Sequence, residues 1–276
     1  MTTSDTGFDS EAQEAVLKFL DQRLHAPVAL DVWSRKESPL LLTDRDPATH
    51  AAEVVALARQ LSALHPAFRL TLYDLDRHAG RAVEAGIDRA PTTVFRGING
   101  RELRFVGAWT GALFQSVLES IAFLGSGESP LSDDSTATLA ALERDVTIDV
   151  LGAMYDGHSA HMLRLIAALA VASRHVRATF TELVEYPIFA ASRNVDQVPV
   201  VTVGGIASLG TWGEAELVEW VRRVAAGDDR EVERPAVLTS PYYTQADVDR
   251  LMAEDAASST PPELPPTPGG LYIPGR

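Results

Sequence analysis

The 276-residue sequence contains no cysteine. The chain therefore forms no disulfide, binds no metal through a thiolate and has no thiol nucleophile, so thiol redox chemistry by this chain alone is excluded. Long apolar runs are missing as well, because no run approaches the roughly 20 residues that a helix needs to cross a bilayer. The first six residues lack the basic and apolar regions of a signal peptide. We expect a cytoplasmic protein that does not bind or span a membrane.

The chain has fewer basic than acidic residues. The chain carries 24 Lys and Arg against 38 Asp and Glu, a formal net charge of −14. Proteins bind nucleic acid and anionic membranes through an excess of Lys and Arg, so neither is an expected partner. No glycine-rich phosphate loop is convincing, and we expect no cofactor. Hydrophobic residues make up 46% of the chain, which is enough for the packed core of a globular protein.

The sequence does contain an internal repeat. Residues 87–98 return as residues 195–206, and an offset of 108 relates Pro91 to Pro199. A period of this length is typical of a duplicated domain. We expect domain 1 at 8–125, a linker at 126–134, domain 2 at 135–228 and a C-terminal extension at 229–276.

Each half shows the same order of expected elements, judged from apolar periodicity and turn residues. Strands are expected at 28–33, 69–75, 92–95 and 102–106, and again at 146–151, 177–184 and 200–203. Helices are expected near 10–24, 47–64, 79–85 and 110–124, and again near 136–143, 158–173, 189–193 and 214–225. Asp46, followed by Pro47, is the expected N-cap of the second helix. This order predicts an α/β fold with helices on both faces of a mixed sheet.

Three features together resemble one family. They are the two prolines that precede strands, at Ala90-Pro91 and Val198-Pro199, the helix starts about forty residues earlier, and the tandem order. This family is the tandem thioredoxin-fold protein disulfide oxidoreductases, which are glutaredoxin-like, and the N-terminal domain of the alkyl hydroperoxide reductase flavoprotein is built similarly. The resemblance covers about residues 8–226. It implies two tandem thioredoxin-like domains, each a mixed central sheet flanked by helices, with cis peptide bonds at both prolines.

The resemblance also identifies where each Cys-x-x-Cys motif would stand. The first falls on Ala48 and Ala51, and the second on Asp156 and Ser159. None of these side chains can exchange a disulfide, so both sites are expected to be redox-inactive. His50 and His158, which the offset of 108 relates, stand between these positions at the two helix starts.

A binding role does not need thiols. In the thioredoxin fold, the backbone before the cis-proline pairs with an extended peptide. Ala90, Pro91, Val198 and Pro199 are therefore candidate peptide-binding residues, with His50 and His158 across from them. The alternative is that each proline is kept because the fold needs its turn, and the sequence leaves both interpretations open.

Asp156, His158 and His161 form the strongest candidate for other chemistry. Two histidines at spacing i, i+3 share one helix face, and a nearby carboxylate would complete three metal ligands. The alternative is that Asp156 caps the helix and the histidines are partly exposed. The first interpretation predicts a diverged enzyme with a metal or His/Asp site, and the second predicts no catalytic role.

The C-terminal extension differs from both halves. A helix is expected at 244–256, and six of the chain's 16 prolines lie in the last 16 residues. Such a segment favours extended polyproline geometry and forms no packed core. Leu271 and Ile273, near its end, suggest a short docking peptide. A disordered end, or one that packs on its own or a partner subunit, remains open.

These observations favour a redox-inactive tandem thioredoxin-like protein without enzymatic activity. The expected role is that of a protein-binding or peptide-binding scaffold, or of a chaperone-like module, with a protein or peptide as its partner. An oligomer is left open, and the diverged enzyme at Asp156 is the alternative.

Overall fold

The computed structural model describes residues 10–36, 46, 48–228, 230, 234 and 237–258. The described residues up to Tyr242 form one compact unit, and those from Tyr243 form a second. Pro47 and the proline-rich tail, with Leu271 and Ile273, lie outside the described residues.

The first half of the compact unit has the expected order of elements. They are α1 (Ser10–Arg23), β1 (Val28–Ser34), α2 (Ala51–Leu64), β2 (Phe68–Asp74), α3 (Ala79–Glu84), β3 (Thr92–Arg96), β4 (Glu102–Val106) and α4 (Phe114–Ser126). A 3-10 turn at Ile98–Gly100 joins β3 to β4, and Asn99 adopts a φ of 58° there, a conformation that asparagine tolerates. Helix α4 ends at Gly127, which takes the left-handed conformation with a φ of 72°.

The second half repeats this order. Its elements are α5 (Asp133–Ala140), β5 (Val146–Gly152), α6 (Gly157–Ala172), β6 (Val176–Glu182), α7 (Pro187–Ser192), β7 (Gln197–Val198), β8 (Val200–Val203), β9 (Ile206–Leu209) and α8 (Glu214–Ala225). Helix α8 has the bounds expected from the sequence. The short strand β7 is an addition, and its partner strand β10 (Ser240–Pro241) comes after the repeat.

One sheet runs through both halves. Its strand order is β2-β1-β3-β4-β6-β5-β8-β9, and the halves meet where β4 pairs with β6 in parallel. The pairs β1–β2 and β5–β6 are also parallel, whereas the remaining neighbours in this sheet are antiparallel. Phe105 and Phe180 stack across the junction, with ring centroids 5.2 Å apart. Such an aromatic pair adds about 1 kcal/mol to the burial of its surface.

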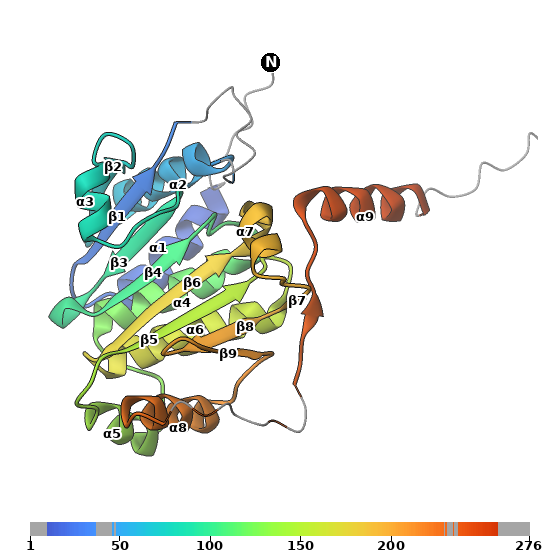
Figure 1. Cartoon of the computed structure of the whole chain (residues 1–276). Helices are drawn as coiled ribbons and strands as arrows, with labels where there is room; N and C mark the ends of the chain where they lie inside the picture. Colours follow the sequence, from blue (N-terminus) through green and yellow to red (C-terminus); the bar gives the residue numbers. More distant parts are fainter. Residues whose placement is uncertain are drawn as a thin grey trace, which may run out of the picture. The chain divides into compact units, whose positions relative to one another are not determined.

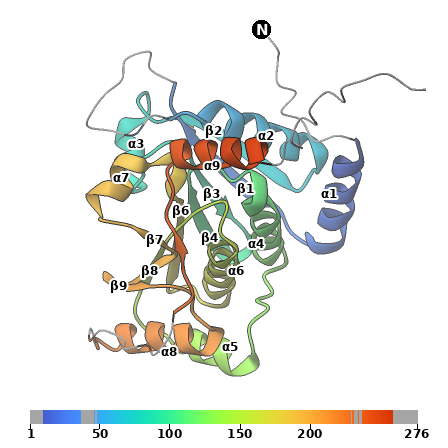
Figure 2. The same ribbon diagram turned by 90° about the vertical axis from the view of Figure 1, so that its right-hand side faces the viewer.

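The two faces of the sheet have different characters. Apolar side chains alternate with polar ones along the strands, so that one face is buried under helices that include α4 and α6 (Figures 1 and 2). Helices α3 and α7 lie on the opposite face (Figures 1 and 2). On that face, Arg104, Thr179, Asp149 and Thr202 stand side by side on four neighbouring strands. The mixed α/β fold with a sheet flanked by helices is thus confirmed.

Trp109 and Trp212 hold equivalent positions in the two halves. They are 0% and 2% exposed, so both belong to the core. Trp109 donates a hydrogen bond from Nε1 to Thr93 Oγ1 at 2.9 Å, and Trp212 stacks on Trp220 with centroids 4.4 Å apart. Each half therefore has its own buried tryptophan under the shared sheet.

The second unit contains α9 (Gln245–Ser258). Thr244 and Asp247 form a reciprocal capping box, because each backbone N–H donates to the other's side chain. A helix was expected here at 244–256. Across the described residues, no helix is both long and apolar enough to span a membrane.

Candidate functional site

Both candidate prolines follow cis peptide bonds, Ala90-Pro91 and Val198-Pro199, as the resemblance implied. Each lies directly before a strand, β3 or β8. The Pro91 carbonyl accepts a hydrogen bond from Gly107 N at 2.8 Å, and the Pro199 carbonyl accepts the equivalent bond from Gly210 N at 2.7 Å. The two turns are therefore built in the same way. We call residues 88–91 with 48–51 the first site, and residues 196–199 with 156–159 the second site.

The second site has a carboxylate at the start of α6. Asp156 is the N-cap: its Oδ1 accepts from His158 N at 3.2 Å, and its Oδ2 accepts from Ser159 N at 2.7 Å. These bonds satisfy N–H groups that have no partner inside the helix, and the negative charge interacts favourably with the helix dipole. Ser159 is fully buried, and its Oγ accepts from Ala153 N at 3.1 Å. All these contacts serve to hold the helix start in place.

The structure does not bring Asp156, His158 and His161 together as ligands. In the part of the chain that is described, no three His, Asp or Glu side chains are grouped so that they could hold a metal ion. His161 Nε2 lies 3.1 Å from the Trp212 carbonyl oxygen. The Asp156 carboxylate accepts hydrogen bonds from His158 N and Ser159 N.

The chain itself occupies the edge before Pro199. Strand β10 pairs antiparallel with β7, so that Ser240 lies opposite Val198 and Pro241 lies opposite Gln197 (Figure 2). The pairing continues with a hydrogen bond of 2.9 Å from Tyr242 N to the Asp196 carbonyl. Main-chain pairing of this kind is how thioredoxin-like and other sheet edges take up an extended peptide. No motif in the sequence indicated this contact.

Side chains also hold this segment, residues 237–242. Ser240 Oγ donates to Asp156 Oδ1 at 2.8 Å, which places a hydroxyl against the carboxylate that stands at the expected first-cysteine position. Tyr155 OH donates to the Pro241 carbonyl at 3.0 Å. The ring of Tyr242 packs on an apolar cluster that includes Val198, and its OH donates to the Leu183 carbonyl at 3.0 Å. The segment is therefore bound through its backbone, a hydroxyl and an aromatic ring.

The first site has the same turn but different side chains. Ala48, Ala51 and Ala90 belong to one buried apolar cluster, so the structure brings the expected motif positions next to the cis-proline turn. Helix α2 starts after His50, which makes no side-chain cap. Instead, His50 N donates to Glu185 Oε1 at 3.1 Å, and its ring Nδ1 bonds with Glu185 Oε2.

Glu185 is a buried carboxylate that sequence reasoning missed. Its side chain is 1% exposed, against 34% for His50. The hydrogen bond to Glu185 raises the pKa of His50 above its ordinary value, and burial of the ring opposes this effect. Glu185 follows β6 in the second half, so the His50–Glu185 pair joins the first site to the other half of the fold.

A second buried carboxylate, Glu182, lies at the end of β6. It accepts hydrogen bonds from the backbone N–H groups of Met154, Val184 and Glu185 at 3.0 to 3.2 Å. Burial raises its pKa to about 7, although these donors act in the opposite direction. Met154 belongs to the turn before α6, so Glu182 contacts the turn that leads to the second site, while Glu185 contacts the first site. The only signal in the sequence was two acidic residues, three positions apart, near the end of an expected strand.

The expected role of Asp46 as the N-cap of α2 is wrong. Its carboxylate accepts from Ile188 N at 2.6 Å and from Phe189 N at 3.0 Å, at the start of α7 in the second half. The physical reason is that α7 begins with Pro187 and has no side-chain cap of its own, so its first N–H groups need an acceptor. Asp46 thereby adds a contact between the segment before the first site and the second half.

Residues of the turn at the first site line two cavities. One has a volume of about 290 Å³ and is lined by residues that include Ala90, Phe189 and Ser192. The other has a volume of about 320 Å³ and is lined in part by the polar row of the sheet that contains Asp149. Burial raises the pKa of Asp149. Arg89 and Phe189 line both cavities, and the guanidinium lies 3.8 Å from the centroid of the ring. Among the described residues, no strand pairs with residues 88–90.

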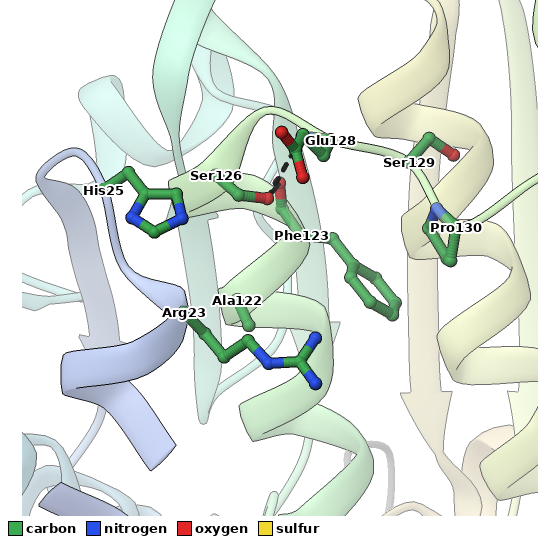
Figure 3. A pocket seen from close by; sticks show the side chains of 8 residues that line it. All are labelled: Arg23, His25, Ala122, Phe123, Ser126, Glu128, Ser129 and Pro130. Atoms are coloured by element: carbon green, nitrogen blue, oxygen red, sulfur yellow. Dashed lines mark hydrogen bonds between the residues drawn. The ribbon is translucent and has the colours of Figure 1, made fainter. Parts of the chain in front are cut away.

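A third cavity is lined by a different set of residues. It has a volume of about 240 Å³ and is formed at the ends of α1 and α4 and by the linker after α4 (Figure 3). Ser126 Oγ donates to the Phe123 carbonyl at its wall. It shares no lining residue with the first two cavities.

No protein-family model matches the sequence, and no curated protein matches it. Solved structures do resemble it. The N-terminal NTD_N/C domain of alkylhydroperoxide reductase AhpF from Enterococcus faecalis aligns with a TM-score of 0.67 at 16% identity, over 78% of this chain and all (100%) of that one. A protein disulfide oxidoreductase from Aeropyrum pernix K1 aligns with a TM-score of 0.66 at 19% identity, over 81% of this chain and 95% of that one. These likenesses concern the fold: the two halves of the compact unit have a thioredoxin-like fold in tandem, and the sequence contains no cysteine.

Proposed function

We propose that this chain is a redox-inactive peptide-binding protein, and that its first site takes up an extended segment of a partner protein. The observation that carries the proposal is the pairing of β10 with β7 at the second site. There, the edge before a cis-proline holds an extended peptide, which belongs to the same chain. The first site repeats this turn, and within the described residues its edge has no paired strand.

The surroundings of the first site support peptide binding. Two cavities adjoin the turn, and Phe189 with its stacked Arg89 offers an amphipathic surface that lines both. When a peptide adds to a sheet edge, pockets beside the edge take its side chains, so these cavities suit a bound peptide. Because the chain has no thiol, the bound segment is held without disulfide exchange.

We propose a scaffold or chaperone-like role for this binding. The domains at 8–125 and 135–228 would act as one body, because the sheet is shared and Asp46 and His50 contact the second half. The C-terminal peptide with Leu271 and Ile273 is a proposed further contact for the same partner or for a larger assembly.

Selection of a displayed random-peptide library on the full chain tests the first site. We expect selected peptides to bind the unchanged protein and to lose at least tenfold in affinity with Ser192→Trp, since Ser192 is exposed and the indole would fill the cavity beside Ala90. Ala191→Trp is the matched control, because Ala191 is exposed on the same helix and lines neither cavity. Peptides that bind both variants equally, or a selection that yields none, would show that the proposal is wrong.

A further inference from the structure

The second site holds residues 237–242 by contacts that depend on sequence, beyond the pairing of backbones. Ser240 donates its hydroxyl to Asp156, and Thr239 Oγ1 donates to Gln197 Oε1 at 2.8 Å. Tyr242 packs its ring on the apolar cluster and donates its OH to a main-chain carbonyl. A different sequence in this place would lose the hydroxyl contact, the ring contact or both.

The attachment of this segment is limited in extent. The β ladder covers only Ser240 and Pro241, and Pro241 is exposed. Further toward the N-terminus, Leu238 is 62% exposed and is held through its carbonyl, which accepts from Thr211 N at 3.1 Å. A short ladder is weak as an intermolecular contact. As part of the same chain, however, it benefits from an effective concentration on the order of millimolar.

From this geometry we infer that the second site is a peptide-binding site specific for an extended Ser/Thr-Pro-Tyr sequence. Residues 237–242 fill it in cis, and the same segment of a second copy fills it once the cis strand is released. Asp156 selects the hydroxyl, because its Oδ1 faces Ser240 and a negatively charged residue there would be repelled. Tyr155 holds the carbonyl of the proline, which needs no N–H of its own. The apolar cluster around Val198 takes the aromatic ring.

The inference differs from the proposed function in site and in ligand. The proposed function concerns the edge before Pro91 and a partner still to be identified. The inference concerns the edge before Pro199 and a ligand of stated sequence, so each can fail while the other stands.

The test uses the full chain with its own strand weakened by Ser240→Asp and Tyr242→Ala. The first change sets a second carboxylate against Asp156, and the second removes the ring. The probe is a fluorescein-labelled peptide with the sequence of residues 237–243, followed by fluorescence anisotropy. We expect saturable binding to this variant and at least tenfold weaker binding to the unchanged chain, in which the cis strand competes. A scrambled probe, and a probe with Asp in place of its serine, should each bind at least tenfold more weakly.

Two further variants make the result decisive. Asp156→Asn in a Tyr242→Ala background, where residue 240 remains serine, keeps an oxygen acceptor for the helix N–H groups and should let the Asp-containing probe bind as well as the original. Ser192→Trp, which fills the cavity of the first site, should leave the affinity for this probe unchanged. The inference is overturned if the scrambled probe binds as well as the original, if the unchanged chain binds as tightly as the variant, or if Ser192→Trp removes the binding. Ser240→Asp alone is the milder variant. If this variant and the double variant are both folded and neither binds the probe, the inference is also overturned.

Discussion

Raising the pH from 5 to 8 is expected to lower the free energy of unfolding by about 3 kcal/mol, with Glu182 as the main cause. Burial raises the pKa of this carboxyl from 4.5 to about 7. Between these two values the folded state keeps the proton that the unfolded state has lost, so stability falls as pH rises and becomes level above about 7. His50 adds to the decline, because its raised pKa gives stability that is present below 6.5 and is lost as pH rises through the folded value.

Urea unfolding at pH 5, 6, 7 and 8 measures this slope. Glu182→Gln removes the titrating group and keeps an oxygen that can accept from Met154 N and Val184 N, so most of the slope should disappear. Glu84→Gln, an exposed carboxyl on α3, is the matched control and should leave the slope unchanged. If the unchanged protein were equally stable at pH 5 and pH 8, the assignment of a raised pKa to Glu182 would be wrong.

His50→Ala is expected to lower the free energy of unfolding by about 2 kcal/mol at pH 6, because it removes the ring partner of a buried carboxylate. Glu185 would keep the hydrogen bond from the backbone N–H of residue 50 and lose the one to Oε2. The cost should become smaller as the pH rises through the raised pKa of His50, because the ring then loses its charge.

The repeat supplies the control for this change. His158 occupies the equivalent position in the second half, and only its backbone N–H takes part in the hydrogen bonds of the described site. His158→Ala should therefore cost less than about 0.5 kcal/mol. A double-mutant cycle with Glu185→Gln isolates the pair, since the neutral amide of that variant needs no cation and should reduce the cost of removing the ring. Equal losses for the two histidine variants would contradict the asymmetry between the sites.

The architecture could be predicted because its signals are local and occur twice. The turn before Pro91 returns before Pro199, apolar periodicity identified α6 and α8 closely, and both cis bonds followed from the resemblance. Two copies of one pattern support each other, whereas one copy alone would have been weak. The four residues at the expected cysteine positions were enough to exclude disulfide chemistry.

The long-range contacts that define the two sites could not be predicted from local sequence patterns. His50 and Glu185 are 135 residues apart, Asp46 and Ile188 are 142 apart, and Asp156 and Ser240 are 84 apart. None of these pairs follows from a local periodicity or a spacing, because each depends on how the two halves and the extension pack. Asp46 shows the consequence. Beside Pro47 it has the local pattern of a helix cap, and its carboxylate caps a different helix in the other half.

The repeat explains how one fold could give two unlike sites. In the second half, Asp156 supplies a carboxylate that binds the hydroxyl of Ser240, and the edge is filled. In the first half, Ala48 takes the same expected position without a polar group, and His50 turns to Glu185 instead. The two sites therefore differ in what they can hold, although both retain the turn that presents a sheet edge.

The most direct test of the account is amide hydrogen exchange, measured by mass spectrometry, on the segments before the two prolines. The account predicts that residues 196–198 are protected in the unchanged chain and lose protection with Ser240→Asp, since β10 pairs with Gln197 and Val198. Residues 88–90 should exchange faster than residues 196–198 and become protected only when a selected peptide is added. If the two segments exchange at the same rate, and neither Ser240→Asp nor the peptide alters either one, the edges before the prolines do not bind peptides.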